Sequence, residues 1–549
     1  MGVVLWNNAF AQTKTPMNRF KPESIVGDWF YVQGLHPYYH QSWVDTLATQ
    51  VGVKGLRIGF EWWEIEKSKK VFDWAAIDSV FKVKDKYNLK YIVTPGYGNG
   101  LYSVGGQGQS QYCRSFDLST ELEMNAYIDF LKVGMERYKN KGVIWEIINE
   151  PDLFIYLNDP AGCRAAIGNI TKAQQGVLYA SLLKKVAEQV RPLFPNETII
   201  TGGLAFAGSD FTNAFIDQAA TDRSFNAFDA FGFHEYEMAM EKCNPSDQLN
   251  SGTWKLGQLS SRLQQNGYTN TTFLNTETGG SGGDNFENSP YDDRWDGFDL
   301  DGSLSDLQQA AYIPRTYLYG LTNSSSLYVY HKFFDEPRNW QGIVDQPRER
   351  YFGLMDTLNK RKPSFYAMKT MLLVLGGYTL VQNNSQCNTA DKVNWKMLNA
   401  HLVFVKNQDT THAVWAVQDA TGKLSHTRVV RYFLPNGSYK TTGMLNQNYG
   451  NTVVTNGFAD ILIDEMPVYL AKNKTVTGFD ETNMEAINQV FPNPFKDEIN
   501  VSNPQSWTLI SSTGSIVAKG NSKTIVTSEI QNGLYLLKLE NGATYKLTK

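Results

Sequence analysis

The stretch GVIWEIINEP, residues 142–151, decides the fold because it joins a buried strand to a carboxylate. An apolar run of this length, bounded by polar residues, is typical of a strand in a parallel sheet that is covered on both faces. Asn149 and Glu150 follow where this strand should end. A carboxylate at the rim of a buried strand loses hydration, so we expect Glu150 either to pair with a cation or to take part in chemistry.

Similar apolar runs recur along residues 20–370 and alternate with segments of helical period. They lie at 24–36, 53–60, 89–97, 197–205, 228–236, 271–278 and 325–333. Between Met124 and Tyr138, apolar residues recur at spacings of three and four, which predicts one of the helices. A Thr120–Glu123 capping box precedes this helix. Eight strands alternating with helices predict a (β/α)8 TIM barrel, although a doubly wound sheet would show the same alternation.

Polar residues at the predicted strand ends favour the barrel, because its βα loops build the active face. They are Arg57, Tyr97, Glu150, His234, Glu277 and His331. Glu150 and Glu277 end the fourth and seventh strands, so we expect their carboxyls to converge at the mouth of the barrel. Glycosidic bond cleavage requires such a pair: one carboxyl protonates the leaving oxygen, and the other attacks or stabilises the cationic centre.

The amino-acid composition limits the classes of molecule that the protein is expected to bind. Lysine and arginine number 51 against 55 acidic residues, without a long run of one sign, which argues against nucleic acid as a partner. No apolar run approaches the roughly 18 residues of a transmembrane segment. Aromatic residues make up 13% of the chain, and this content mildly favours a carbohydrate ligand.

The chain of 549 residues is long enough for two or three domains. After residue 370 the apolar period changes to two, which predicts a β-sandwich over 371–472. The other predicted segments are a signal-peptide remnant and leader at 1–19, the barrel at 20–370, a linker at 473–488 and a small all-β domain at 489–549.

Neither the cysteines nor the glycine-rich loop indicates a metal centre. Cys113, Cys163, Cys243 and Cys387 show no C-x-x-C spacing, and their three pairings stay open, with a Cys113–Cys163 bridge as one alternative to free thiols. The loop 279–306 is interpreted as solvated, with a flap or a calcium-bound turn as alternatives. We expect no cofactor and no metal.

Five segments resemble the clan A glycoside hydrolases, which are retaining (β/α)8 enzymes. GVIWEIINEP resembles their strand-four signature and FLNTETG (273–279) their strand-seven segment. The other matches are GLRIGFEWWEIEKSKKVFDWAAID (55–78), FGFHEY (231–236) and YFGLMDTLNKRKPSFYAM (351–368). The resemblance covers residues 20–472 and implies a retaining β-glycoside hydrolase, with a β-glucan-like polymer as the first candidate substrate. A non-catalytic glycan-binding protein and a transglycosylase are the alternatives.

The resemblance also implies roles for individual residues. Glu150 would be the general acid/base and Glu277 the nucleophile. Asn149 would bind the 2-hydroxyl of the sugar, and Arg57 would keep Glu277 ionised.

Two further residues and a set of aromatic side chains complete the implied site. His234 and Tyr236 alternate on one strand, so both would face the cleft, with Tyr236 donating a hydrogen bond to Glu277. Aromatic rings at strand ends would form sugar subsites: Trp63, Tyr97, Tyr330 and Trp340. Strand eight lacks the tryptophan of many clan members, and Tyr328 or Tyr330 is its expected substitute.

The C-terminal segment resembles the type A sorting domain of the type IX secretion system of Bacteroidetes. The matching residues are Asn493-Pro494-Phe495, Thr513-Gly514, Asn532-Gly533-Leu534-Tyr535 and Lys546-Leu547. The resemblance implies passage through the periplasm, secretion or attachment at the cell surface, and the type IX machinery as a partner. A carbohydrate-binding module is the alternative, although Trp507 is the only tryptophan of this segment.

Overall fold

The computed structural model of the protein describes residues 14–33, 41–96, 98–102, 118, 121–154, 170–236, 254–280, 305–323, 327–335, 351–387, 397–417, 427–472, 490–491, 495–501, 506–511, 515–540 and 544–549. Several sequence predictions lie outside these residues. They concern residues 1–13, the capping residue Thr120, most of the loop 279–306, the linker 473–488 and the side chains of the four cysteines.

Eight parallel strands form the barrel, in the order β5-β4-β3-β2-β1-β8-β7-β6. Their bounds are β1 Phe30–Gln33, β2 Gly55–Glu61, β3 Lys90–Gly96, β4 Val143–Ile147, β5 Thr198–Thr201, β6 Phe231–His234, β7 Phe273–Thr278 and β8 Tyr328–Tyr330. Isolated bridges join Ile200 to Ala230 and Leu204 to Phe233, between the two outermost strands, so the barrel is nearly closed. The predicted (β/α)8 fold is confirmed, and the doubly wound alternative is wrong.

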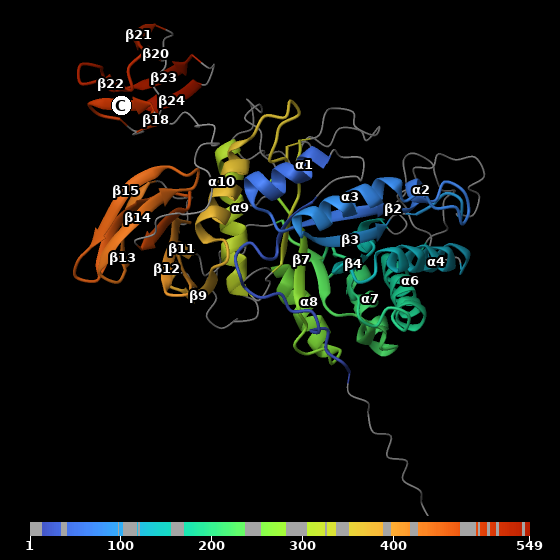
Figure 1. Ribbon diagram of the computed structural model, residues 1–549. Coiled ribbons are helices and arrows are strands. Elements are labelled where there is room, and N and C mark those ends of the chain that lie inside the picture. The colour runs from blue at the N-terminus through green and yellow to red at the C-terminus, as the bar shows by residue number, and fades with distance from the viewer. Residues whose placement is uncertain are drawn as a thin grey trace, which may run out of the picture. The chain divides into compact units, whose positions relative to one another are not determined.

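Helices follow the strands along the chain and pack on the outside of the barrel (Figure 1). They are α1 Gln41–Thr46, α2 Trp62–Ile65, α3 Ala75–Tyr87, α4 Glu121–Tyr138, α5 Pro151–Phe154, α6 Lys172–Lys185, α7 Asp210–Thr221, α8 Trp254–Gln265, α9 Asp306–Gly320 and α10 Pro363–Leu375. Capping boxes at Thr171–Gln174 and Ser305–Gln308 fix the starts of α6 and α9. The last helix, α10, continues past residue 370, where the sequence predicted the end of the barrel.

Side chains on the barrel strands alternate between the interior and the helices. An interior cluster includes Tyr31, Ile92, Ile144, Ile200, Leu274 and Val329. Two residues further along three of these strands, and therefore on the same face, stand the polar residues Gln33, Thr94 and Glu146. This polar layer lies above the apolar interior, toward the C-terminal ends of the strands.

A β-sandwich follows the barrel. Its larger sheet contains β9 Thr379–Asn383, β10 Gln386–Cys387, β11 Met397–Lys406, β12 Asp409–Ala416, β14 Gly437–Gly443, β15 Asn448–Val454 and β17 Val468–Lys472. Strands β13 Arg428–Phe433 and β16 Phe458–Ile463 form a second sheet. Trp415 and Tyr469 of the larger sheet belong to the same hydrophobic core as the barrel helices, so barrel and sandwich form one compact unit.

Residues 475–549 form a separate unit. Its strands are β18 Val490–Phe491, β19 Glu498–Val501, β20 Trp507–Ser511, β21 Ile516–Gly520, β22 Thr524–Val526, β23 Leu534–Leu539 and β24 Thr544–Thr548. They form two sheets, β18-β19-β22 and β21-β20-β23-β24. Trp507 is buried in the core of this unit and donates a hydrogen bond to the carbonyl of Ser522, so its ring offers no stacking surface to a sugar.

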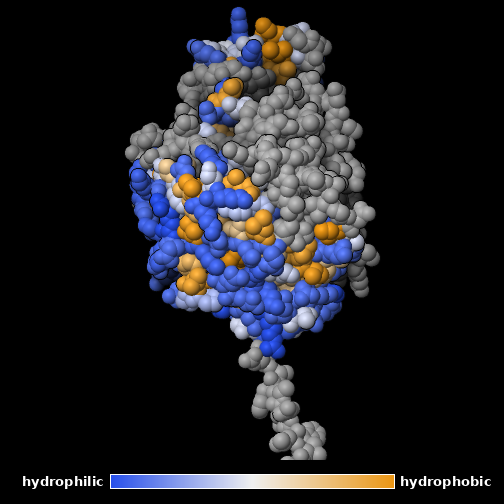
Figure 2. Space-filling model, turned by 90° about the vertical axis from the view of Figure 1, so that its right-hand side faces the viewer, coloured by the Kyte–Doolittle hydropathy of each residue, from blue (hydrophilic) through white to orange (hydrophobic). Residues whose placement is uncertain are grey.

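On one side of the barrel, the described surface is mainly hydrophilic. Figure 2 shows this face, on the side of α2, α4 and α6, with small groups of apolar side chains among hydrophilic ones. Exposed apolar residues on the described helices include Leu122 and Val133, and scattered residues of this kind are ordinary on a solvent-exposed surface. Among the described residues, no helix combines the length and the apolar character that a membrane crossing requires.

Two histidines are buried in the sandwich, so we expect the free energy of unfolding to depend on pH. His401 Nε2 lies 3.0 Å from His412 Nδ1. Burial lowers the pKa of His401 to about 3, with the charge of His412 adding to the effect, and burial lowers the pKa of His412 to about 4. The unfolded chain therefore takes up protons below pH 6.5 that the folded chain does not. We expect each histidine to reduce the free energy of unfolding by about 1.4 kcal/mol per pH unit between pH 6 and pH 4.

Calorimetry at pH 7 and pH 5 measures this effect as a fall in Tm. The double variant His401→Gln/His412→Gln is expected to show a smaller fall than the wild type, while His234 and His331 remain in both proteins. An equal fall in the two proteins would place the titration elsewhere.

Candidate active site

The chain turns sharply after β4, and this turn places Glu150. Ile148 and Glu150 adopt left-handed conformations, with φ of 68° and 41°. Such angles cost about 1–3 kcal/mol in residues other than glycine, so the surrounding structure must hold them. The N–H of Glu150 donates to the carbonyl of Gly203 over 3.1 Å, just beyond the end of β5. Neighbouring strands thus fix the backbone of Glu150.

A bulge near the end of β7 places Glu277. Phe233 of β6 pairs with Asn275, but His234, the next residue, pairs with Glu277. The strand therefore carries one extra residue, Thr276, and a bulge of this kind changes the direction of the following side chain. Glu277 is 8% exposed.

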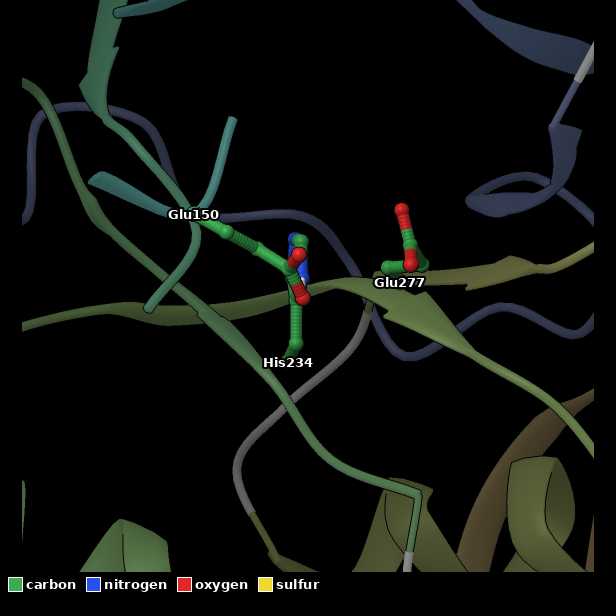
Figure 3. Close-up of side chains that lie close together, drawn as sticks. All are labelled: Glu150, His234 and Glu277. Atoms are coloured by element: carbon green, nitrogen blue, oxygen red, sulfur yellow. Dashed lines mark hydrogen bonds and ion pairs between the residues drawn. The ribbon is translucent and has the colours of Figure 1, made fainter. Parts of the chain in front are cut away.

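The two glutamates converge with a histidine. Nδ1 of His234, at the end of β6, lies 2.9 Å from Oε1 of Glu150. One ligand atom each of Glu150, His234 and Glu277 lies within 4.8 Å of the other two. Figure 3 shows Glu150 pointing toward the imidazole, with the Glu277 carboxyl to one side of both. The sequence prediction that these carboxyls converge therefore agrees with the geometry.

Glu277 is held as a carboxylate by two donors. Arg57 Nη1 donates to Glu277 Oε2 over 2.8 Å, and the hydroxyl of Tyr236 donates to Oε1. Burial alone would raise the pKa of Glu277, but the charges of His234, His331 and Arg57 and the hydrogen bond from Tyr236 outweigh it and lower this pKa to about 2. Tyr236 lies beyond the end of β6, not on the strand as the sequence predicted, yet it reaches the carboxylate.

Three polar side chains surround this centre. Arg57 Nη2 donates to Oδ1 of Asn149 over 2.6 Å, so the amide is fixed beside Glu150. Arg57 Nη1 also lies 3.4 Å from Oε1 of Gln33, and the same oxygen lies 3.0 Å from Nδ1 of His331. The end of β1 and the residues just after β4 and β8 thus contribute to one connected group of polar atoms. Arg57 joins this group from within β2, four residues before the end of the strand, and not from the strand end as the sequence predicted.

Among the described residues, the aromatic side chains predicted as sugar subsites do not form a group around the two glutamates. Tyr330 is 1% exposed, packs with the helices and donates its hydroxyl to the carbonyl of Phe352. Tyr328 is fully buried in the same layer, so neither tyrosine replaces the missing tryptophan of strand eight. Trp63 is half-buried in α2, just after the end of β2. Tyr97 and Trp340 lie outside the described residues.

Sequence reasoning missed three residues near the site. A Cβ on Gly203 would lie 2.2 Å from His234 Nε2 and 2.6 Å from Thr276 Oγ1, so only glycine fits there. Asp152 accepts hydrogen bonds from the N–H groups of Ala205 and Phe206. Burial raises the pKa of Asp152 to about 6, against the effect of these hydrogen bonds. Glu146, fully buried in β4, accepts hydrogen bonds from Arg57 of β2 and Thr94 of β3.

The sequence contains only weak signals for these three residues. Glu146 stood out only as a charge within an apolar run, and Asp152 and Gly203 are common residue types for loops. Sequence alone could not show that Gly203 lies against His234, since the two belong to different strand ends.

Glu150, His234 and Glu277 also have ligand atoms suited to a divalent cation. Both oxygens of Glu277, however, already accept hydrogen bonds, one of them from the guanidinium of Arg57. A metal ion would have to displace Tyr236 or lie close to this positive charge. These hydrogen bonds therefore suit an ionised carboxylate better than a metal ligand.

Comparisons with known proteins give the class of the fold. A family 39 glycoside hydrolase from the gut symbiont Bacteroides cellulosilyticus WH2 is similar to this chain with a TM-score of 0.59 and 18% identity, over 82% of this chain and 83% of that one. The family 39 enzyme from Xanthomonas axonopodis pv. citri is similar with a TM-score of 0.51 and 15% identity, over 86% and 99%. No curated protein matches the sequence.

The protein thus has the fold of these family 39 glycoside hydrolases, with its eight-stranded barrel and its β-sandwich in one unit. Residues 489–549 match the secretion system C-terminal sorting domain, and the carbohydrate-binding alternative for this segment is wrong. This domain directs the protein through the type IX secretion system, to the medium or to the cell surface.

Proposed function

We propose that the protein is a retaining β-glycoside hydrolase that acts by double displacement. One observation carries the proposal: oxygens of Glu150 and Glu277, on the ends of β4 and β7, lie within 4.8 Å of each other. Carboxyl groups lie about 5–5.5 Å apart in retaining enzymes and about 6.5–9.5 Å apart in inverting ones. The close pair supports direct attack by a carboxylate over attack by an intervening water.

The environments of the two glutamates support different roles. Glu277, ionised beside Arg57, attacks the anomeric carbon while Glu150 gives its proton to the leaving oxygen. The products of this step are a free alcohol and a glycosyl ester on Glu277. Glu150, now a carboxylate, takes a proton from water, and this water cleaves the ester with a second inversion at the anomeric carbon. In this mechanism the amide of Asn149, which Arg57 orients, binds the 2-hydroxyl of the sugar.

We propose that the secreted protein acts on a β-linked polysaccharide or oligosaccharide, with a β-glucan-like polymer as the first candidate substrate. Export by the sorting domain supports a polymer, because a secreted hydrolase acts on material that the cell cannot take up intact.

Proton NMR of fresh products tests the proposal. A panel of β-glucans, mannans and xylans is incubated with the wild type, and the anomer that forms first is recorded. We expect initial β-anomers from one polymer. Initial α-anomers would overturn the retaining mechanism, and no cleavage of any β-glycan would favour a binding protein.

A further inference from the structure

Glu146 is a buried carboxylate in the strand that leads to Glu150. Its side chain is 0% exposed, one layer below the mouth of the barrel. Four donors from four other segments surround it: Arg57 Nε at 2.7 Å, Thr94 Oγ1 at 2.8 Å, Gly203 N at 3.1 Å and Thr276 Oγ1 at 2.5 Å. A fully buried charge is tolerated only with partners of this kind, so the position is specifically built for a carboxylate.

Two of these donors connect Glu146 to the nucleophile. Arg57 donates to Glu146 through Nε and to Glu277 through Nη1, so one guanidinium bridges the two carboxylates. Thr276, which donates to Glu146, is the bulge residue directly before Glu277. The direction of the Glu277 side chain therefore depends on Glu146 through both the backbone and the guanidinium.

A third donor connects Glu146 to Glu150. The N–H of Gly203 donates to Glu146 Oε1, and the carbonyl of Gly203 accepts from the N–H of Glu150. The strained backbone of Glu150 is thus held by the residue Gly203, which Glu146 holds in turn. Through Arg57, the same carboxylate also orients Asn149.

Glu146 also affects how strongly Arg57 attracts the carboxylate of Glu277. Arg57 carries one positive charge and contacts two carboxylates, so Glu146 takes up part of the attraction that Glu277 would otherwise receive. A carboxylate that is less strongly held by a cation stays a better nucleophile, because its lone pairs are more available. Removal of the Glu146 charge would leave Glu277 as the one carboxylate in contact with Arg57 among the described residues.

We propose that Glu146 is a positioning residue. It fixes the side chains of Glu150 and Glu277, and it weakens the electrostatic attraction between Arg57 and Glu277. This inference deepens the proposed function and rests on it. Glu146 does not touch the substrate; it acts through Arg57, Thr276 and Gly203.

The variant Glu146→Gln tests the inference, since it keeps the shape and removes the charge. Glu197→Gln is the matched control. Glu197 is also buried and accepts from Trp145 Nε1 and from the N–H of Asn140, but it precedes β5 and lies at the opposite end of the barrel. Both variants are assayed beside the wild type on an aryl β-glycoside of the sugar that the NMR panel identifies.

We expect Glu146→Gln to lower kcat about 100-fold with KM within about threefold of the wild type, because the lost interactions act in the transition state. The rate at which a 2-deoxy-2-fluoro glycosyl fluoride esterifies Glu277 is expected to fall by a similar factor. Glu197→Gln is expected to keep both rates within about twofold. A purely structural role would lower Tm in both variants and leave the rates of the folded protein unchanged, and this result would overturn the inference.

Thr94→Val keeps the test decisive if Glu146→Gln does not fold. Thr94 is buried in β3, and this change removes one donor from Glu146 without altering any charge. We expect kcat to fall about fivefold at unchanged KM. An unchanged kcat would overturn the inference while the proposed function stands. An inactive wild type would overturn the proposed function and the inference together.

Discussion

The variant Glu277→Gln is expected to lose activity by a factor of about 10⁴ or more in kcat/KM, the largest effect of any single change in the site. The amide keeps the size of the side chain but cannot form the glycosyl ester. Because the pKa of Glu277 is about 2, the wild-type carboxylate stays ionised above about pH 4, and we expect no loss of kcat/KM from its protonation in that range.

Mass spectrometry checks this prediction independently of turnover. A 2-deoxy-2-fluoro glycoside is expected to add its mass to the peptide that contains Glu277 in the wild type and to leave the variant unlabelled. Circular dichroism serves as the control for folding, since Arg57 keeps Glu146 as a partner in the variant. A label on another residue would show that the nucleophile is not Glu277.

The fold could be predicted because its signals are local. Each barrel strand is an apolar run, and the polar residues after these runs mark the face of the site. The five segments that resemble clan A enzymes include Arg57, Glu150 and Glu277, which the structure brings together. Sequence could place them on one face because all parallel strands of a barrel end at the same rim.

Contacts that depend on strand register could not be predicted. The alternation along β8 places Val329 in the barrel interior, so Tyr330 packs outward against the helices instead of facing a sugar. The bulge at Thr276 adds one residue to β7, and no pattern in the sequence predicts this bulge. Glu146 is charged within an apolar strand, and only the barrel shows that Arg57, Thr94, Thr276 and Gly203 converge on it.

For Glu150→Gln we expect an effect that depends on the leaving group. A polysaccharide leaves as an alkoxide unless its oxygen receives a proton, so kcat/KM is expected to fall by about 10²–10⁴. A 2,4-dinitrophenyl glycoside needs no proton, so its kcat/KM is expected to stay within about tenfold of the wild type. Water attack on the ester still requires the base, so kcat falls and KM falls with it.

Azide separates this role from simple misfolding, because it attacks the glycosyl ester without giving up a proton. We expect azide to restore kcat of Glu150→Gln on the dinitrophenyl substrate and to yield a β-glycosyl azide, since two inversions retain the configuration. Azide has no such effect on the wild type, where water already has its base. A loss that is equal for both leaving groups and insensitive to azide would mean that Glu150 only supports the site. The acid would then have to be sought elsewhere, with Asp152 as the next carboxyl along the chain.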